Sequence, residues 1–146
     1  MEKQVLLSIR GQQMFEGCSE PEVTELVTRG TLHMDDNRNV TLVYQESELT
    51  GLEGTQTTIQ VEPQSVTLLR QGEVNSQMVF QEGRRHLSLY NTPYGALTMG
   101  ISTRKMKVDL DETGGSIEIS YAMELDHAVV GENLFRIHVR TGAIPQ

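Results

Sequence analysis

Apolar and polar residues alternate along short segments of the chain, and no stretch keeps a helical period. The clearest segment is 116–125, where odd-numbered residues are apolar and even-numbered ones are polar or small. The segment 133–141 repeats this pattern. Alternation with a period of two places one face of a strand on a core and the other in water. The sequence therefore predicts an all-β protein.

Turn-forming residues separate these segments at intervals of roughly 8–12 residues. Glycine, proline, aspartate and asparagine adopt the backbone angles that tight turns require. Clusters of them lie at 35–39, 50–54, 71–73, 81–83, 92–95 and 111–115. Their spacing predicts about ten strands in one antiparallel meander. The longer connections are expected at 12–21 and 126–133.

One irregularity in the alternation bears on how the sheet ends. Apolar residues occupy odd positions from Leu97 to Ile101 and even positions from Met106 to Leu110. A slip of one residue turns every side chain over, so a β-bulge or sharp bend is predicted near 103–105. Bulges allow a sheet to curve, and closure removes exposed strand edges. We therefore expect one domain over residues 1–146, a small antiparallel barrel of about 8–10 strands.

Two charged residues fall on the apolar phase of their strands. Glu46 continues the face of Val40, Leu42 and Tyr44, and Arg70 follows Val66 and Leu68 on one face. If those faces point inward, both charges lie at strand ends inside the barrel, where buried charges must be paired. One interpretation is a polar anchor at the mouth of a ligand cavity. The other is an internal ion pair, or charges that leave the barrel into solvent.

The predicted interior is lined mostly by side chains of medium size, and the chain has no tryptophan. A barrel of about ten strands encloses a wider interior than one of eight. We therefore predict a residual cavity or open-mouthed pocket bordered by several inward residues. They are Leu42, Leu68, Leu97, Met99, Ile101, Ile119, Tyr121, Met123, Phe135, Ile137 and Val139.

Composition narrows the function classes. Twelve basic against twenty acidic residues give a net charge of −8. Such a chain repels nucleic acid and anionic membranes, so neither is an expected partner. The single cysteine, Cys18, forms no internal disulfide, and the first residues contain no signal-peptide pattern, which favours a soluble, cytoplasmic protein. Whether the chain forms a homodimer stays open.

The sequence contains no motif of established chemistry. Its four histidines are scattered, and Cys18 and Ser116 lack the surroundings of a catalytic nucleophile. The stripe of Arg136, His138 and Arg140 is typical of a solvated strand face. We therefore predict no metal, no cofactor and no catalytic residue, and favour a protein that is not an enzyme.

Taken in order, several segments resemble the YwiB-like family, a bacterial family of small domains of unknown function. They are Tyr44-Gln45-Glu46-Ser47-Glu48-Leu49-Thr50-Gly51, Leu69-Arg70-Gln71-Gly72, Met78-Val79-Phe80 and Tyr90-Asn91-Thr92-Pro93-Tyr94-Gly95, with Thr103. The resemblance runs over nearly the whole chain and implies a calycin-type, lipocalin-like β-barrel. It brings no activity, cofactor or partner. The family pattern includes Glu46, Arg70, Tyr90, Thr92 and Gly95.

These observations leave three functional hypotheses, of which a binding module is preferred. The barrel would take a small, largely apolar ligand with an acidic or anionic group, inside it or at its mouth. The candidate ligand-binding residues are Tyr44, Glu46, Arg70, Tyr90, Tyr94 and Tyr121. The first alternative is a protein-interaction or structural domain with a filled core. The second is an enzyme with Glu46 as acid or base and Arg70 as anion clamp.

Overall fold

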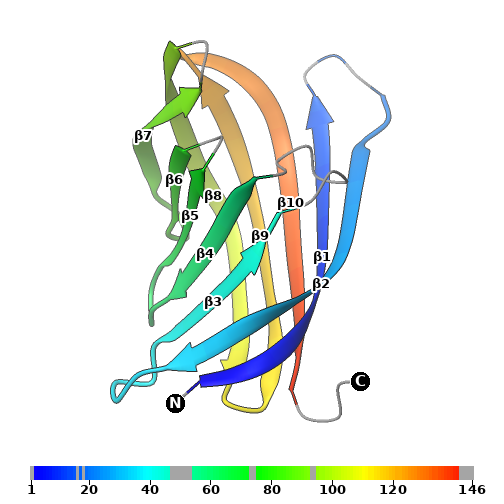
Figure 1. The fold of residues 1–146 in the computed structure, drawn as a ribbon. Coiled ribbons are helices and arrows are strands. Elements are labelled where there is room, and N and C mark those ends of the chain that lie inside the picture. The colour runs from blue at the N-terminus through cyan, green and yellow to red at the C-terminus, as the bar shows by residue number, and fades with distance from the viewer. Residues whose placement is uncertain are drawn as a thin grey trace.

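The computed structural model describes residues 2–15, 17, 19–46, 54–72, 75–92 and 95–141. Ten β-strands run through these residues (Figure 1). They are β1 (Glu2–Phe15), β2 (Glu22–Met34), β3 (Val40–Gln45), β4 (Thr55–Val61), β5 (Val66–Gly72), β6 (Asn75–Phe80), β7 (Arg85–Thr92), β8 (Gly95–Asp111), β9 (Gly114–Leu125) and β10 (Ala128–Arg140). No helix among the described residues is long and apolar enough to cross a membrane.

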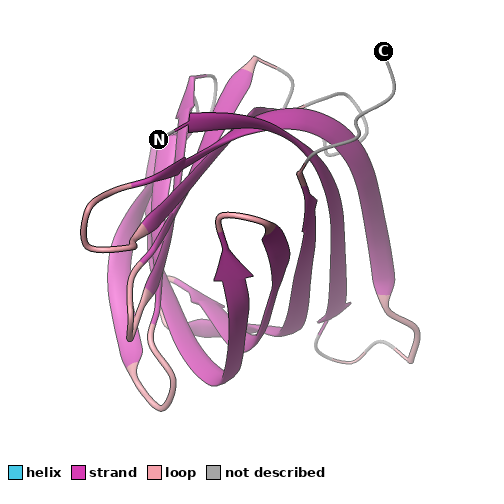
Figure 2. Cartoon of the chain, turned by 90° about the horizontal axis from the view of Figure 1, so that it is seen from below, coloured by secondary structure: helices cyan, strands magenta, loops and turns pink. Residues whose placement is uncertain are grey.

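The strands close into one antiparallel barrel in which each strand pairs with its neighbours along the chain. Closure is made between the first and last strands, from Leu6↔Arg140 to Phe15↔Gly131. Figure 2 shows the strands as a ring seen from below. The predicted all-β fold and its barrel architecture are confirmed, with the strand number at the upper end of the expected range.

The predicted phase slip is a β-bulge in β8. Thr103 pairs with Tyr121 and Lys105 with Ser120, so Arg104 is the extra residue that shifts the register. Its guanidinium lies on the outside and contacts Glu132 at 2.9 Å. The extra residue changes the phase, so that Met106 and Leu110 pack against the core after the bend, as Met99 and Ile101 do before it, while Val108 is 40% exposed.

The expected long connection at 126–133 is wrong. β9 continues to Leu125 and β10 begins at Ala128, so the hairpin loop consists of Asp126 and His127. Both residues have positive φ values, 49° and 70°. A two-residue loop with two positive φ values matches the twist of a hairpin, which explains why no longer connection is needed. The prediction failed because neither residue is glycine, the usual signal for such a turn.

Apolar side chains pack the interior of the barrel. Its largest fully buried side chains share the inward phase of their strands. They are Phe80, Leu7, Leu32, Leu42, Ile59, Ile101, Ile117, Ile119, Ile137, Val5 and Val66. All but one of the residues predicted to line the interior are buried or pack against this core, and the exception, Leu97, is half-buried.

The wall of the barrel differs in height around its circumference. Strands β3 to β6 have 6–7 residues each, whereas β1, β2, β8, β9 and β10 have 12–17. The β6–β7 seam has the shortest ladder, with the pairs Asn75↔Asn91 and Ser76↔Tyr90. Farther along it, the Ser88 hydroxyl donates a hydrogen bond to the Gln77 carbonyl at 2.6 Å. The short strands end at a set of inward polar side chains.

Candidate functional site

A row of polar side chains crosses the short wall of the barrel. Register pairs place Tyr44 beside Thr57, Thr57 beside Arg70, Arg70 beside Ser76 and Ser76 beside Tyr90. Tyr44, Thr57 and Ser76 are 3%, 0% and 5% exposed, so this is the inner face of the sheet. The alternation that places apolar side chains in the core thus places polar side chains on the inner face at the end of the barrel where this row lies.

Glu46 lies one step beyond this row and contacts Thr57 and Arg70. Its side chain is 2% exposed, and its Oε1 accepts a hydrogen bond from the Thr57 hydroxyl at 2.7 Å. The same oxygen lies 4.0 Å from Arg70 Nε. The prediction that Glu46 and Arg70 point inward and lie near each other is confirmed. Their distance makes them a loose ion pair.

A second polar row lies on the long wall. Register pairs join Thr103 to Tyr121, Tyr121 to Asn133, Asn133 to Gln13, and Gln13 to Glu22. The Tyr121 ring packs on the core through Phe80, with ring centroids 4.8 Å apart and a tilt of 60°. Such tilted aromatic pairs are favourable, so the ring is held in one position. Tyr121 thus connects the packed core to the polar end of the barrel.

A half-open pocket of about 240 Å³ separates the two rows. We call it the inner pocket. It is lined by Ile9, Gly11, Gln12, Gln13, Glu22, Thr24, Leu26, Tyr44, Glu46, Arg70, Met78, Tyr121, Met123, Asn133, Leu134 and Phe135. Three residues predicted to border a cavity, Tyr121, Met123 and Phe135, are among them. The predicted pocket is therefore present at one end of the barrel, while the rest of the interior is filled.

Four of the six candidate ligand-binding residues meet at this pocket: Tyr44, Glu46, Arg70 and Tyr121. Tyr90 belongs to β7 and pairs with Ser76, but its side chain is outside the described part of the structure. Tyr94 lies outside the described residues. The assignment of these residues to ligand binding stays a prediction.

Comparison with known proteins places this barrel in a family. Residues 7–137 match the family model for the Domain of unknown function (DUF1934). The chain belongs to the DUF1934 family. The resemblance inferred from the sequence is thereby confirmed.

Two comparisons support this membership with a named relative. The chain is 26% identical over 141 residues to the "Uncharacterized beta-barrel protein YwiB" of Bacillus subtilis (strain 168), covering 97% of this chain and 94% of that protein. The crystal structure of the YwiB protein from Bacillus subtilis matches with a TM-score of 0.81, again at 26% identity and the same coverage. The relative is described as uncharacterised, so the likeness concerns fold and family.

Four buried side-chain atoms of the described part of this DUF1934 domain lack hydrogen-bond partners: Thr55 Oγ1, Ser76 Oγ, Arg70 Nε and Asn133 Nδ2. The donors Arg70 Nε and Asn133 Nδ2 belong to residues that line the inner pocket, and Asn133 is 9% exposed. Buried polar atoms are paired in the great majority of cases, and an unpaired donor costs about 1–3 kcal/mol. The two donors therefore create a preference for an acceptor group in the pocket.

Sequence reasoning missed Asn133 and Gln13 as site residues, although their signal was present. Asn133 shares its phase with Phe135, Ile137 and Val139, just as Gln13 follows the inward face of β1. A polar residue on an apolar phase is the same signal that identified Glu46 and Arg70. Only charged residues on an apolar phase were considered as site residues, so the amide side chains of Asn133 and Gln13 were overlooked.

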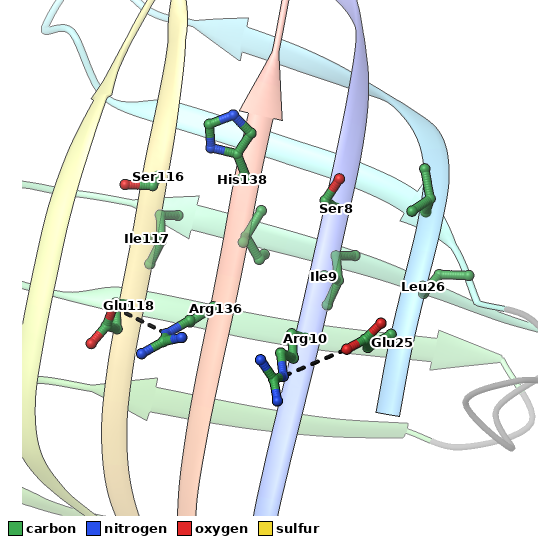
Figure 3. Close-up of a pocket in the computed structure, with 12 residues that line it drawn as sticks. Ser8, Ile9, Arg10, Glu25, Leu26, Ser116, Ile117, Glu118, Arg136 and His138 are labelled. Atoms are coloured by element: carbon green, nitrogen blue, oxygen red, sulfur yellow. Dashed lines mark hydrogen bonds and ion pairs between the residues drawn. The ribbon is translucent and has the colours of Figure 1, made fainter. Parts of the chain in front are cut away.

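A second concavity, of about 350 Å³, lies on the outer wall of the DUF1934 barrel across β2, β1, β10 and β9 (Figure 3). Arg10 and Arg136 are cross-strand neighbours there. Each forms an ion pair with the strand on its other side, Arg10 with Glu25 at 3.6 Å and Arg136 with Glu118 at 3.2 Å. These charges are about half-exposed and compensate each other, as on a solvated face. The outer groove therefore lacks the unpaired donors of the inner pocket.

The buried tyrosines predict how stability depends on alkaline pH. Burial raises the pKa of Tyr121 to about 12, and burial beside Glu46 raises that of Tyr44 as well. An unfolded tyrosine loses its proton near pH 10, so above that pH the unfolded state binds fewer protons than the folded one. The free energy of unfolding should therefore fall between pH 10 and 12, by up to about 1.4 kcal/mol per pH unit for Tyr121.

Urea unfolding at pH 9, 10 and 11 measures this slope in the wild type and in Tyr121→Phe. Phenylalanine keeps the ring that packs on Phe80 but has no proton to lose, so its slope should be smaller. Equal slopes in the two proteins would contradict the assignment of alkaline sensitivity to Tyr121.

Proposed function

We propose that this domain is a binding module that takes a small, largely apolar ligand with one acidic group in the inner pocket. The observation that carries the proposal is the pair of buried donors without a hydrogen bond, Arg70 Nε and Asn133 Nδ2, in residues that line a half-open cavity. An anionic acceptor makes stronger hydrogen bonds with such donors than a neutral one does. The ligand's acidic group is assigned to these donors.

The remaining lining supports an apolar body for the ligand. Ile9, Leu26, Met78, Met123 and Phe135 supply apolar walls around the donors. Methionine side chains are flexible and polarisable, and they adapt to ligands of different shape. Predominantly apolar walls with a few placed polar groups are typical of small-molecule sites. We further propose that the protein acts in the cytoplasm and that nucleic acid and membranes are not its partners.

One observation favours the alternative, a protein-interaction domain. On the outer face of β7, Leu87 and Leu89 are 56% and 60% exposed. Apolar side chains that gather on a surface mark protein contacts when the patch is large enough. Two leucines are a small patch, whereas the inner pocket combines a cavity with unpaired donors, so we give the ligand-binding function priority.

Filling the pocket with a bulky side chain tests the proposal. Titration with an anionic dye that brightens in apolar pockets should show saturable binding to the wild type. In Met123→Trp the binding should fall by at least about tenfold, because the indole occupies the cavity that Met123 lines. Val129→Trp is the matched control, since Val129 is 57% exposed on the outside of β10 and should leave binding unchanged. Circular dichroism verifies that each variant folds.

Two results would overturn the proposal. One is the absence of saturable dye binding to the wild type. The other is equal binding by folded Met123→Trp and Val129→Trp, which would place the dye elsewhere. If the dye binds the wild type and Met123→Trp abolishes this binding, the natural ligand can be sought next. Mass spectrometry of small molecules extracted from protein purified without denaturant would identify it.

A further inference from the structure

Gly11 occupies an inward position of β1 at the inner pocket. On this strand Val5, Leu7 and Ile9 are buried at alternate positions, and Gly11 is the next in the series. Its register partners, Thr24 on β2 and Phe135 on β10, both line the pocket, as Gly11 itself does. A position that would normally add a side chain to the core adds none here. The missing side chain leaves part of the pocket open.

The backbone gives no reason for a glycine at this position. A Cβ atom added to Gly11 would have no heavy atom within 4 Å, and its φ lies outside the left-handed region. The other glycines for which this space is described differ. At Gly30 a Cβ would lie 2.6 Å from the Val43 carbonyl oxygen, at Gly100 it would meet the Arg85 side chain at 3.3 Å, and the rest have positive φ values. Gly11 alone among them lacks both a steric and a conformational requirement.

The geometry points to Gly11 as the residue that sets the length of the ligand, and to a short-chain monocarboxylate as the ligand class. This inference rests on the proposed function. The carboxylate is bound by Arg70 and Asn133, and the apolar chain extends into the space that a side chain at position 11 would fill. A larger residue at position 11 would shorten the longest ligand that fits.

Charge favours a single carboxylate over a dianion such as a phosphate monoester. The charged lining residues at neutral pH are Glu22, Glu46 and Arg70, so one cation faces two anions. Arg70 is moreover 4.0 Å from the Glu46 carboxylate, which already compensates part of its charge. A dianion would meet about twice the repulsion that a monoanion meets here, and a planar monocarboxylate offers two acceptor oxygens to the two donors without hydrogen-bond partners.

The volume of the inner pocket limits the length of the ligand's carbon chain. A group the size of a water molecule, such as one non-hydrogen atom with its hydrogens, occupies roughly 30 Å³. The inner pocket of about 240 Å³ therefore accommodates roughly eight such groups. A monocarboxylate with about six carbon atoms has that number of non-hydrogen atoms. Valine at position 11 would occupy the space of three carbon atoms, which leaves room for a ligand about the size of propionate.

Calorimetric titrations with sodium propionate, hexanoate and decanoate test the inference. The wild type should bind hexanoate more tightly than the other two. In Gly11→Val, hexanoate affinity should fall at least about tenfold, while propionate affinity changes by less than about threefold. Ser8→Val is the matched control, because it adds bulk to the same strand on the outer groove and should keep the wild-type preference. Gly11→Ala should give an intermediate loss of hexanoate binding.

The outcomes separate this inference from the function on which it rests. Unchanged hexanoate binding in folded Gly11→Val would overturn the role of Gly11. A wild type that passes the dye test but binds none of the three carboxylates would overturn the ligand class and leave the binding module in place. Unfolding of Gly11→Val would also overturn the inference, because valine fits a strand and the position has free space.

Discussion

Replacing Arg70 with alanine should lower the free energy of unfolding by about 3 kcal/mol. The change leaves the Glu46 carboxylate buried, with its side chain 2% exposed, and without its cation. Breaking a buried ion pair from one side typically costs about 3–5 kcal/mol. The lower end is expected because Glu46 keeps its hydrogen bond from Thr57 and because Arg70 is 21% exposed. Urea denaturation at neutral pH measures the change.

Two further variants show whether the lower stability of Arg70→Ala comes from the unpaired Glu46 carboxylate. The double variant Glu46→Gln with Arg70→Met removes both charges and should lose less stability than Arg70→Ala. Arg104→Ala breaks an exposed ion pair with Glu132 and should melt like the wild type. If Arg70→Ala also melted like the wild type, the two charges would be independent of each other in the fold.

Phe80→Ala should be the most destabilising of the changes considered, with a loss of about 4 kcal/mol. The Phe80 side chain is 1% exposed and packs on the Tyr121 ring, at the end of β6 that pairs with Val66 of β5. Truncation leaves a cavity between the core and the inner pocket, and cavities in a closed barrel collapse poorly because each strand is fixed by two neighbours. Chemical denaturation gives the magnitude.

Leu89→Ala is the matched control for Phe80→Ala. Leu89 is also apolar and lies on the neighbouring strand, but it is 60% exposed on the outside of the barrel. Its loss should lie within the small range of surface substitutions, about 0.5 kcal/mol. Comparable losses in the two variants would mean that the β6–β7 region is not packed as described.

The alternation of residues predicted most of this fold because a closed barrel imposes one rule on every strand. Inward and outward positions alternate along each of them, so segments such as 116–125 specify their own orientation. The bulge at Arg104 was found for the same reason, since the phase had to change sides. The short β9–β10 hairpin was missed because two residues other than glycine, Asp126 and His127, adopt positive φ values there. Aspartate and histidine adopt such angles more often than most residues, but they are a weaker turn signal than glycine.

The site was predicted where a charge interrupts an apolar phase. Glu46 and Arg70 met that condition, and the barrel brings them together with Tyr44 and Tyr121 from other strands. The contribution of Gly11 could not be predicted, because a glycine is conspicuous only when its surroundings are known. The volume of the pocket likewise depends on how ten strands are staggered, which residue periodicity does not specify.

Closure of the ladder has a consequence for the kind of partner protein that this domain can accept. A partner that binds by strand addition needs a row of free backbone N–H and C=O groups at a sheet edge. Each described strand has two paired neighbours, but residues 22–29 of β2 pair with β1 alone and have no ladder on the side of β3. The shortest ladder lies at the β6–β7 seam, beside the exposed Leu87 and Leu89. A partner protein must therefore recognise side chains on the outer wall, or add a strand where the ladders are short, at residues 22–29 of β2 or at the β6–β7 seam.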